Sequence, residues 1–320
     1  MRTCLIYGHI GLDMDVAFNL KEFYKSLGFN AVFSDKLYNA DLLVITRGGD
    51  SAMDLSTYSF GLIHFYDYGG WKHGRLIKSL PYSNTIIFST APAARKSIIE
   101  ELGFPENQIH VAFPPVAVKL WTKKIKTSKF RYIHIGNYKP IDNVDAFKEK
   151  FNKCVTELGV DVWGMGWNNV VKEEKYHGKL GLFKVSSVYA QSECALGLMY
   201  PFQRALTFSG RFWHAPLNGC AIFSEPGLHT RSIPGILETD YSAGDILDKF
   251  KTLKNRQQIQ ENAISYWQEK WNEVKKLAVD SFSILEQAPK VNSSAIVYTK
   301  LKAHNTLKKY YQIMEIFKLS

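Results

Sequence analysis

The chain has 320 residues, of which 46% are hydrophobic and 22% are charged. This composition is typical of a folded globular protein and excludes an intrinsically disordered chain, while the length favours two domains over one. The longest apolar stretches fall well short of the roughly 20 residues that a membrane-spanning helix needs. The first segment, MRTCLIYGHIGLD, is typical of a β-strand rather than of a signal peptide.

The formal net charge of +10 predicts an anionic partner or substrate. Lysine and arginine gather in three segments, at residues 119–132, 251–256 and 300–311. In the last segment, aromatic and aliphatic residues interleave with lysines at the spacing of a basic amphipathic helix. Nucleic acid, anionic lipid headgroups and phosphorylated substrates all fit this charge, so composition alone leaves the three open.

The four cysteines are far apart, with no CxxC pair, and no histidine cluster has metal-ligand spacing. We therefore expect buried thiols in a reducing cytosol and no zinc site. The expected location is the cytoplasm, with peripheral association to the inner face of the membrane through the basic residues. The cysteines are Cys4, Cys154, Cys194 and Cys220.

The first half of the chain alternates short apolar runs with helical patterns. Helices are predicted at residues 16–27 and 92–102, and each is followed by a glycine that ends it. Near-continuous apolar strands that alternate with helices predict a parallel sheet covered on both faces. The predicted strands are residues 3–7, 31–33, 42–46, 62–65, 85–88 and 110–113.

A proline-led basic segment, 114–129, has the composition of a linker, and the alternation restarts after it. The second half has strands predicted at 132–135, 161–163, 195–199 and 221–224. Its helices are predicted at 144–158, 184–191, 210–218 and 243–254, and the pattern is helical at 257–287 and 294–319.

This organisation predicts an α/β fold with two Rossmann-like domains that face each other across a cleft, followed by long C-terminal helices. The sites should lie at the carboxyl ends of the strands. The predicted units are a first domain at 1–118, a linker at 119–130, a second domain at 131–284, and a C-terminal helix at 285–320 that packs back on the first domain.

Four strand ends in the second half carry residue types that bind ligands. Each leads to a helix N-terminus, where free amides attract anions. Asparagine bonds hydroxyl groups, tryptophan stacks on a base or sugar, and arginine attracts phosphate. Taken singly, each residue also has a purely structural explanation. The glycines fit turns, the tryptophan fits the core, the arginine fits a surface ion pair, and the histidine fits a helix position where its hydrogen bonds are made. Their recurrence at successive strand ends favours a site. The segments are HIGNY, VWGMGW, LGLMYPFQR and FSGRFWHAPLNGCAIFSE.

From residue 131 to about residue 282, these segments and YSAGDILDKFKTLKNRQQIQENAISYW resemble the C-terminal domain of group-1-type glycosyltransferases with the GT-B fold. The spore-maturation-protein-like branch is the most similar, in both the order and the spacing of the motifs. The resemblance implies that the second domain binds a nucleotide sugar, that the first domain binds the acceptor, and that no metal is required.

The resemblance also implies roles for single residues. Arg211 stands where the family places a basic residue against the donor phosphates, and His214 where related enzymes use a glutamate for the ribose. Leu206 replaces the first residue of the two-glutamate signature of many retaining members, and Pro216 should kink or shorten its helix. The residues expected to bind the donor are Gly136, Asn137, Gly166, Trp167, Arg204, Ser209, Arg211, His214 and Glu225.

An inverting enzyme of this fold needs a general base from the first domain. The candidates follow the first and fourth predicted strands. Asp13 and its neighbour Asp15 also fit a helix cap, and Asp67, which lies among aromatic residues and glycines, fits either a sugar-contact loop or a plain turn. The catalytic candidates are Asp67, Asp13, His9 and His64.

The leading functional hypothesis is a glycosyltransferase that moves a sugar from a nucleotide-sugar donor to a glycan or lipid-linked glycan. A first alternative is a phage-type DNA-modifying glycosyltransferase that acts on a modified base, where the basic charge would serve the phosphate backbone. A second alternative is a non-catalytic nucleotide- or glycan-binding protein on the same scaffold.

Overall fold

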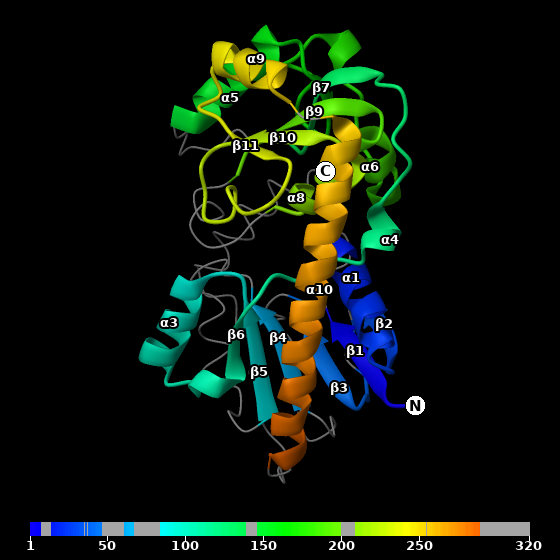
Figure 1. Ribbon diagram of the computed structural model, residues 1–320, viewed down its shortest axis with the longest axis vertical. Helices are drawn as coiled ribbons and strands as arrows, with labels where there is room; N and C mark the ends of the chain where they lie inside the picture. Colours follow the sequence, from blue (N-terminus) through cyan, green and yellow to red (C-terminus); the bar gives the residue numbers. More distant parts are fainter. Residues whose placement is uncertain are drawn as a thin grey trace.

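A computed structural model of the protein describes residues 1–7, 14–34, 36, 38–46, 61–66, 84–138, 146–199, 209–253 and 255–288. It contains two parallel sheets, drawn one above the other in Figure 1, with one long helix, α10 (Arg256–Gln287), running along both. None of the described helices combines the length and the apolar character needed to cross a membrane.

The first sheet has the strand order β2-β1-β3-β4-β5-β6, and every pairing is parallel. Strands β3 and β5 are buried along their whole length, as expected for a sheet covered on both faces. All six predicted strands are confirmed. The elements are β1 (Thr3–Tyr7), α1 (Met14–Ser26), β2 (Asn30–Ser34), β3 (Leu42–Ile45), β4 (Gly61–Tyr66), β5 (Thr85–Ser89), α3 (Pro92–Leu102), η3 (Glu106–Gln108) and β6 (Ile109–Val111).

The second sheet has the order β11-β10-β9-β7-β8 and is also parallel. The sequence predicted four of these strands and missed β11, which has only three residues. The elements are β7 (Phe130–Ile135), α5 (Ala146–Glu157), β8 (Asp161–Trp163), η4 (Glu173–Lys175), α6 (Leu182–Tyr189), β9 (Ser192–Gly197), α8 (Arg211–His214), η5 (Pro216–Asn218), β10 (Ala221–Ser224), β11 (Ile236–Glu238) and α9 (Ala243–Lys251).

The helix predicted at 210–218 is divided in two. Helix α8 ends at His214, and a 3-10 turn, η5, begins at Pro216. Proline has no N–H to continue the hydrogen-bond ladder, so the shortening expected from Pro216 is confirmed.

Helix α10 belongs to both halves of the molecule. Its first turns bury Ala263 and Trp267 in the core beneath the second sheet, and its last turns bury Val274 and Leu285 against β1 and α1. The helix predicted at 257–287 is confirmed. The packing changes from the second sheet to the first within this helix, ahead of the boundary predicted at residue 284, and residues 289–320 lie outside the described part.

The linker between the sheets is fixed at helix α4 (Val118–Trp121) by two buried asparagines. From α1, the Asn19 Oδ1 accepts hydrogen bonds from the Ala117 N–H at 2.8 Å and from the Trp121 Nε1–H at 2.6 Å. From η5, the Asn218 side chain donates to the Trp121 carbonyl at 3.2 Å and accepts from the Lys123 N–H at 2.9 Å. One tryptophan therefore joins the two halves.

The far end of the linker is held by Arg256, the first residue of α10. Its guanidinium donates to the carbonyl oxygens of Lys126, Ala190 and Gly219 at 2.7–3.1 Å. Burial lowers the pKa of Arg256. This cation satisfies backbone carbonyls, so its role is to clamp the linker to the second sheet.

Replacing Asn19 with alanine should destabilise the fold. The buried N–H groups that bond its Oδ1 would lose their acceptor, and each buried donor left unpaired costs about 1–3 kcal/mol. We expect the free energy of unfolding in urea to fall by roughly 2–5 kcal/mol. Asn169→Ala, at an exposed asparagine, is the matched control and should change it by less than about 0.5 kcal/mol. Equal effects of the two variants would contradict the role of Asn19.

Candidate functional site

The carboxyl ends of β7 and β8 touch each other through two glycines. A Cβ atom on Gly164 would lie 2.1 Å from the Gly136 carbonyl oxygen, and Gly164 has a φ of +135°. Only glycine permits this approach and this backbone conformation. The Asn137 Oδ1 accepts the Met165 N–H at 2.9 Å, which ties the two loops together. The glycines of HIGN and WGMG therefore build a narrow frame of backbone at this edge.

Trp167 supports this frame from below. Its ring is only 2% exposed and packs against His134, Tyr138 and Phe151, while its Nε1–H donates to the Gly136 carbonyl at 2.7 Å. A ring so deeply buried offers no open face to a base or sugar. The stacking role predicted for Trp167 does not fit this position, because the indole is used to hold the β7 loop.

The Arg211 side chain extends from the start of α8 across the ends of β9 and β7. Its Nη1 donates to the Leu198 carbonyl at 2.7 Å. Cβ atoms placed on Gly197 and Gly136 would lie 3.0 Å from the Arg211 Cδ and 3.3 Å from its Nη2. Arg211 is half-buried and forms no ion pair with another residue of the described part. A guanidinium in a glycine frame with spare N–H donors is suited to bind an anion.

His134 lies beneath Arg211 and is almost wholly buried. Desolvation and the Arg211 charge lower its pKa to about 3, against a hydrogen bond to the Leu196 carbonyl that favours the charged form. The imidazole is therefore neutral at pH 7. Among the described residues at this edge of the sheet, the positive charge is on Arg211.

Glu225, at the end of β10, is fully buried, and its carboxylate accepts several hydrogen bonds. Oε1 accepts the Met199 N–H at 2.8 Å, and Oε2 accepts the Tyr241 hydroxyl at 2.5 Å and the Ser224 hydroxyl at 3.3 Å. Burial, followed by the charge of Glu225, raises the pKa of Tyr241 well above its usual value. Glu225 therefore fixes the ends of β9 and β10, and the sugar contact predicted for it does not fit this burial.

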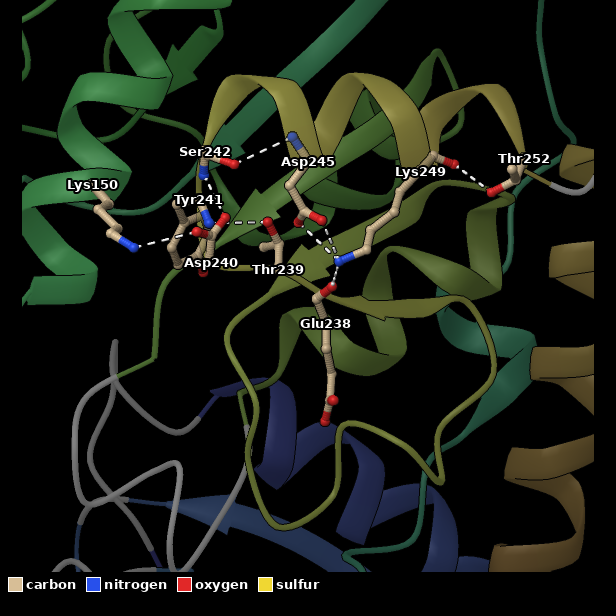
Figure 2. Close-up of polar contacts among 9 residues, drawn as sticks. All are labelled: Lys150, Glu238, Thr239, Asp240, Tyr241, Ser242, Asp245, Lys249 and Thr252. Carbon is tan, nitrogen blue, oxygen red and sulfur yellow. Dashed lines mark hydrogen bonds and ion pairs between the residues drawn. The ribbon is translucent and has the colours of Figure 1, made fainter.

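Tyr241, which sequence reasoning missed, is held in place by the turn between β11 and α9 (Figure 2). It has a φ of +61°, and its N–H donates to the Thr239 hydroxyl at 3.0 Å. Asp240 accepts the Ser242 N–H at 2.9 Å and pairs with Lys150 at 3.3 Å. Ser242 caps α9 by accepting the Asp245 N–H. This strained but well-bonded turn directs the Tyr241 hydroxyl to Glu225.

The remaining predicted residues fall into three groups. Ser209 and Gly166 are described and lie at the same edge, and His214 is buried at 4% exposure on α8. His64 is described only as backbone, in β4, where it pairs with Ile45. The predicted residues outside the described part are His9, Asp13, Asp67 and Arg204. Within the described part, no group of three or more histidine, cysteine or carboxylate side chains is arranged to hold a metal ion.

No family model matches the sequence of this chain, and no curated protein matches it either. Solved structures do match. AviGT4, a glycosyltransferase involved in avilamycin A biosynthesis, superposes with a TM-score of 0.62 at 11% identity, over 89% of this chain and 98% of that chain. T4 phage BGT in complex with UDP and Mn²⁺ gives a TM-score of 0.53 at 10% identity, over 90% and 99%.

A structure of the DNA-modifying enzyme β-glucosyltransferase also gives a TM-score of 0.53, at 12% identity, over 89% of this chain and 98% of that chain. The chain has the GT-B fold. The prediction of two Rossmann-like domains is confirmed. In GT-B terms, the Gly136–Gly164 frame and Arg211 lie at the carboxyl edge of the second Rossmann-like sheet.

The low pKa of His134 makes stability depend on pH. Because the unfolded histidine has a pKa near 6.5 and the folded one a pKa of about 3, the unfolded state binds more protons between these values. Stability is therefore lost as pH falls below about 6.5. From pH 7 to pH 5, His134 should remove about 2 kcal/mol of unfolding free energy. Urea denaturation at both values measures this loss.

His134→Gln, whose amide can still donate to Leu196, should flatten that pH dependence. A residual slope is expected from His110 and His229, whose pKa values are also lowered by burial. An unchanged slope in the variant would contradict the assignment of this acid sensitivity to His134.

Proposed function

We propose that the protein is a glycosyltransferase that moves a sugar from a nucleotide-sugar donor to a glycan or lipid-linked glycan acceptor. The observation that carries the proposal is Arg211, a half-exposed guanidinium set across Gly197 and Gly136 with no ion-pair partner among the described residues. The fold supports the proposal, since T4 phage BGT of the same fold was solved with UDP. The motif order supports the finer assignment to the group-1-type, spore-maturation-protein-like branch.

In this reaction, the developing negative charge is on the nucleotide phosphate that leaves. Arg211 would donate hydrogen bonds to that phosphate from a fixed position, which is how preorganised charge lowers a barrier. Because His134 beneath it is neutral at pH 7, Arg211 is the charged group of this pair that would act on the phosphate. Gly136, Asn137, Gly166, Ser209 and the neighbouring strand ends would contact the rest of the donor through backbone groups.

The acceptor hydroxyl must lose a proton, and the first Rossmann-like unit would supply the base. Asp67, Asp13, His9 and His64 remain our candidates; in the sequence, His9 and Asp13 follow β1 and Asp67 follows β4, while His64 belongs to β4. We also propose that the leaving phosphate is stabilised by side chains and backbone N–H groups rather than by a resident metal. Mn²⁺ is present in one T4 phage BGT structure, so metal independence needs a direct test. We place the enzyme in the cytoplasm, with peripheral attachment to the inner membrane face.

A second candidate function is the glycosylation of a modified base in DNA. The linker presents exposed lysines that form no ion pair within the described part, and Arg256 clamps this segment in a fixed path. A DNA-modifying β-glucosyltransferase has the same fold. Clustered, ordered cations are the electrostatic footprint of nucleic-acid binding. The exposed lysines are Lys119, Lys123, Lys124, Lys126 and Lys129.

Replacing Arg211 with alanine should weaken binding of UDP or a UDP-sugar, measured by isothermal titration. Loss of a charge-assisted hydrogen bond costs about 1.5–3 kcal/mol, or roughly 10–150-fold in Kd. Arg131→Ala is the matched control, because this exposed arginine lies near the start of β7, far from the carboxyl end of that strand where Gly136 follows it. Unchanged affinity of the Arg211 variant would remove Arg211 from the phosphate site.

EDTA should leave the turnover of the wild-type enzyme intact. A loss of turnover that Mn²⁺ restores would contradict metal independence.

The two acceptor classes can be separated by one assay with a panel of nucleotide sugars. A glycan or lipid-linked acceptor should be glycosylated with little dependence on salt. A DNA acceptor containing hydroxymethylated bases should be bound with an affinity that falls steeply between 50 and 200 mM salt, because bound counterions are released. Charge-reversal of Lys123 and Lys126 to glutamate should abolish only the DNA activity. Salt-insensitive transfer to glycan, unaffected by these changes, would exclude the DNA function.

A further inference from the structure

Asp15 of the first unit lies against the helix that carries Arg211. It is the second residue of α1, and its Oδ1 accepts the Val16 N–H at 2.9 Å. Its Oδ2 lies 3.7 Å from the His214 Nε2, on α8 of the second unit. The pair therefore joins two helices that follow different sheets, 199 residues apart in the sequence.

Gly210 makes this approach possible. A Cβ atom at Gly210 would lie 2.6 Å from the Asp15 Oδ2, which is closer than real Cβ contacts. The backbone of Gly210 is ordinary, with φ −54° and ψ −25°, so the glycine is required for space and not for conformation. The carboxylate of Asp15 thus occupies the volume where any other residue at position 210 would place its side chain.

His214 faces this carboxylate with unused hydrogen-bonding capacity. Its side chain is 5% exposed, and neither ring nitrogen has a hydrogen-bond partner within the described part. Trp121 packs edge-on at 4.6 Å, and Trp213 lies at 5.6 Å, so water is excluded from the ring. Buried polar groups are almost always bonded. The His214 Nε2 is 3.7 Å from the Asp15 Oδ2. A shift of less than about 1 Å would therefore bring its N–H within hydrogen-bond distance of that carboxylate.

We propose that Asp15 is a positioning residue for the donor helix. By docking on Gly210 and bonding to His214, it holds the first turn of α8, and with it Arg211, in the arrangement that transfer requires. The catalytic part of this inference rests on the proposed function, while the contact itself does not. No hydrogen bond or ion pair joins Asp15 to Arg211 among the described residues, so Asp15 would act on Arg211 through α8. Loss of Asp15 should lower kcat and should raise the donor KM less than Arg211→Ala does, because the Arg211 guanidinium is still present.

A space-exchange experiment tests the contact. Gly210→Ala should be harmful alone, because its methyl group meets the Asp15 carboxylate. Asp15→Ala removes that carboxylate, so Gly210→Ala should add little in the Asp15→Ala background. The new methyl group would also lie 3.2 Å from the Trp213 ring. This smaller part of the Gly210→Ala effect should persist whether or not Asp15 has been replaced. Glu22→Ala is the control, since Glu22 is an exposed acid on the same helix that pairs with Lys25. Its effect should be additive with Gly210→Ala.

Two readouts are needed, the midpoint of thermal unfolding and steady-state turnover of a nucleotide sugar. The proposal expects non-additive unfolding midpoints for Asp15 and Gly210. It also expects at least a tenfold fall in kcat for Asp15→Ala, with a smaller rise in the donor KM than Arg211→Ala produces. Asp15→Asn, which keeps an acceptor oxygen at the same reach, should restore part of the kcat. Additive effects, or a neutral Gly210→Ala, would overturn the contact. An unchanged kcat, or a donor KM raised as much as in Arg211→Ala, would overturn the positioning role.

The same data separate this inference from the proposed function. Non-additive unfolding midpoints without turnover of any nucleotide sugar would retain the contact and refute the transferase. Normal turnover in Asp15→Ala would retain the transferase and refute the positioning role.

Discussion

The arrangement of the two sheets depends on the buried indole of Trp121. Its N–H is bonded to Asn19 of the first unit, its carbonyl to Asn218 of the second, and its ring edge rests on His214. A large rotation of one unit against the other would leave these buried donors without acceptors. The resulting loss of free energy would exceed what new exposed contacts could contribute. Helix α10 adds a second tie, because it packs in both cores. The start of α1 is therefore brought to α8.

The electrostatics of the carboxyl edge follow from burial. Desolvation keeps His134 neutral, and the same effect, with the charge of Glu225, keeps the Tyr241 hydroxyl protonated. Glu225 itself is engaged by the Met199 N–H and by Tyr241. Arg211 is different, since it is half-exposed and always charged. Among the described ionisable groups around the glycine frame, Arg211 is thus the cation that still has N–H donors available, which is the electrostatic requirement of a phosphate site.

Local patterns predicted much of this architecture. Apolar runs located ten of the eleven strands in the described part of the chain. The break at Pro216 followed from proline chemistry, and the glycines after β7 and β8 marked a real close approach. The individual roles were harder to predict. Trp167 and Glu225 have residue types that bind sugars, yet each is buried by partners from other elements, such as Tyr241, 16 residues beyond Glu225. Strand β11 was missed because it follows a proline and a glycine, ends on a glutamate and is only half-buried, so its segment has the composition of a turn.

Long-range packing also explains why this chain has a histidine at position 214, where the resemblance leads one to expect a glutamate. The resemblance places a glutamate where this chain has His214, and that position here is buried and faces Asp15 of the other unit. A glutamate would bring two carboxylates together in a site shielded from water, where like charges repel strongly. An imidazole can instead donate a hydrogen bond to the carboxylate. The residues at positions 15, 210 and 214 therefore fit one another: an acid on α1, a glycine that leaves room for it, and a histidine that can bond to it.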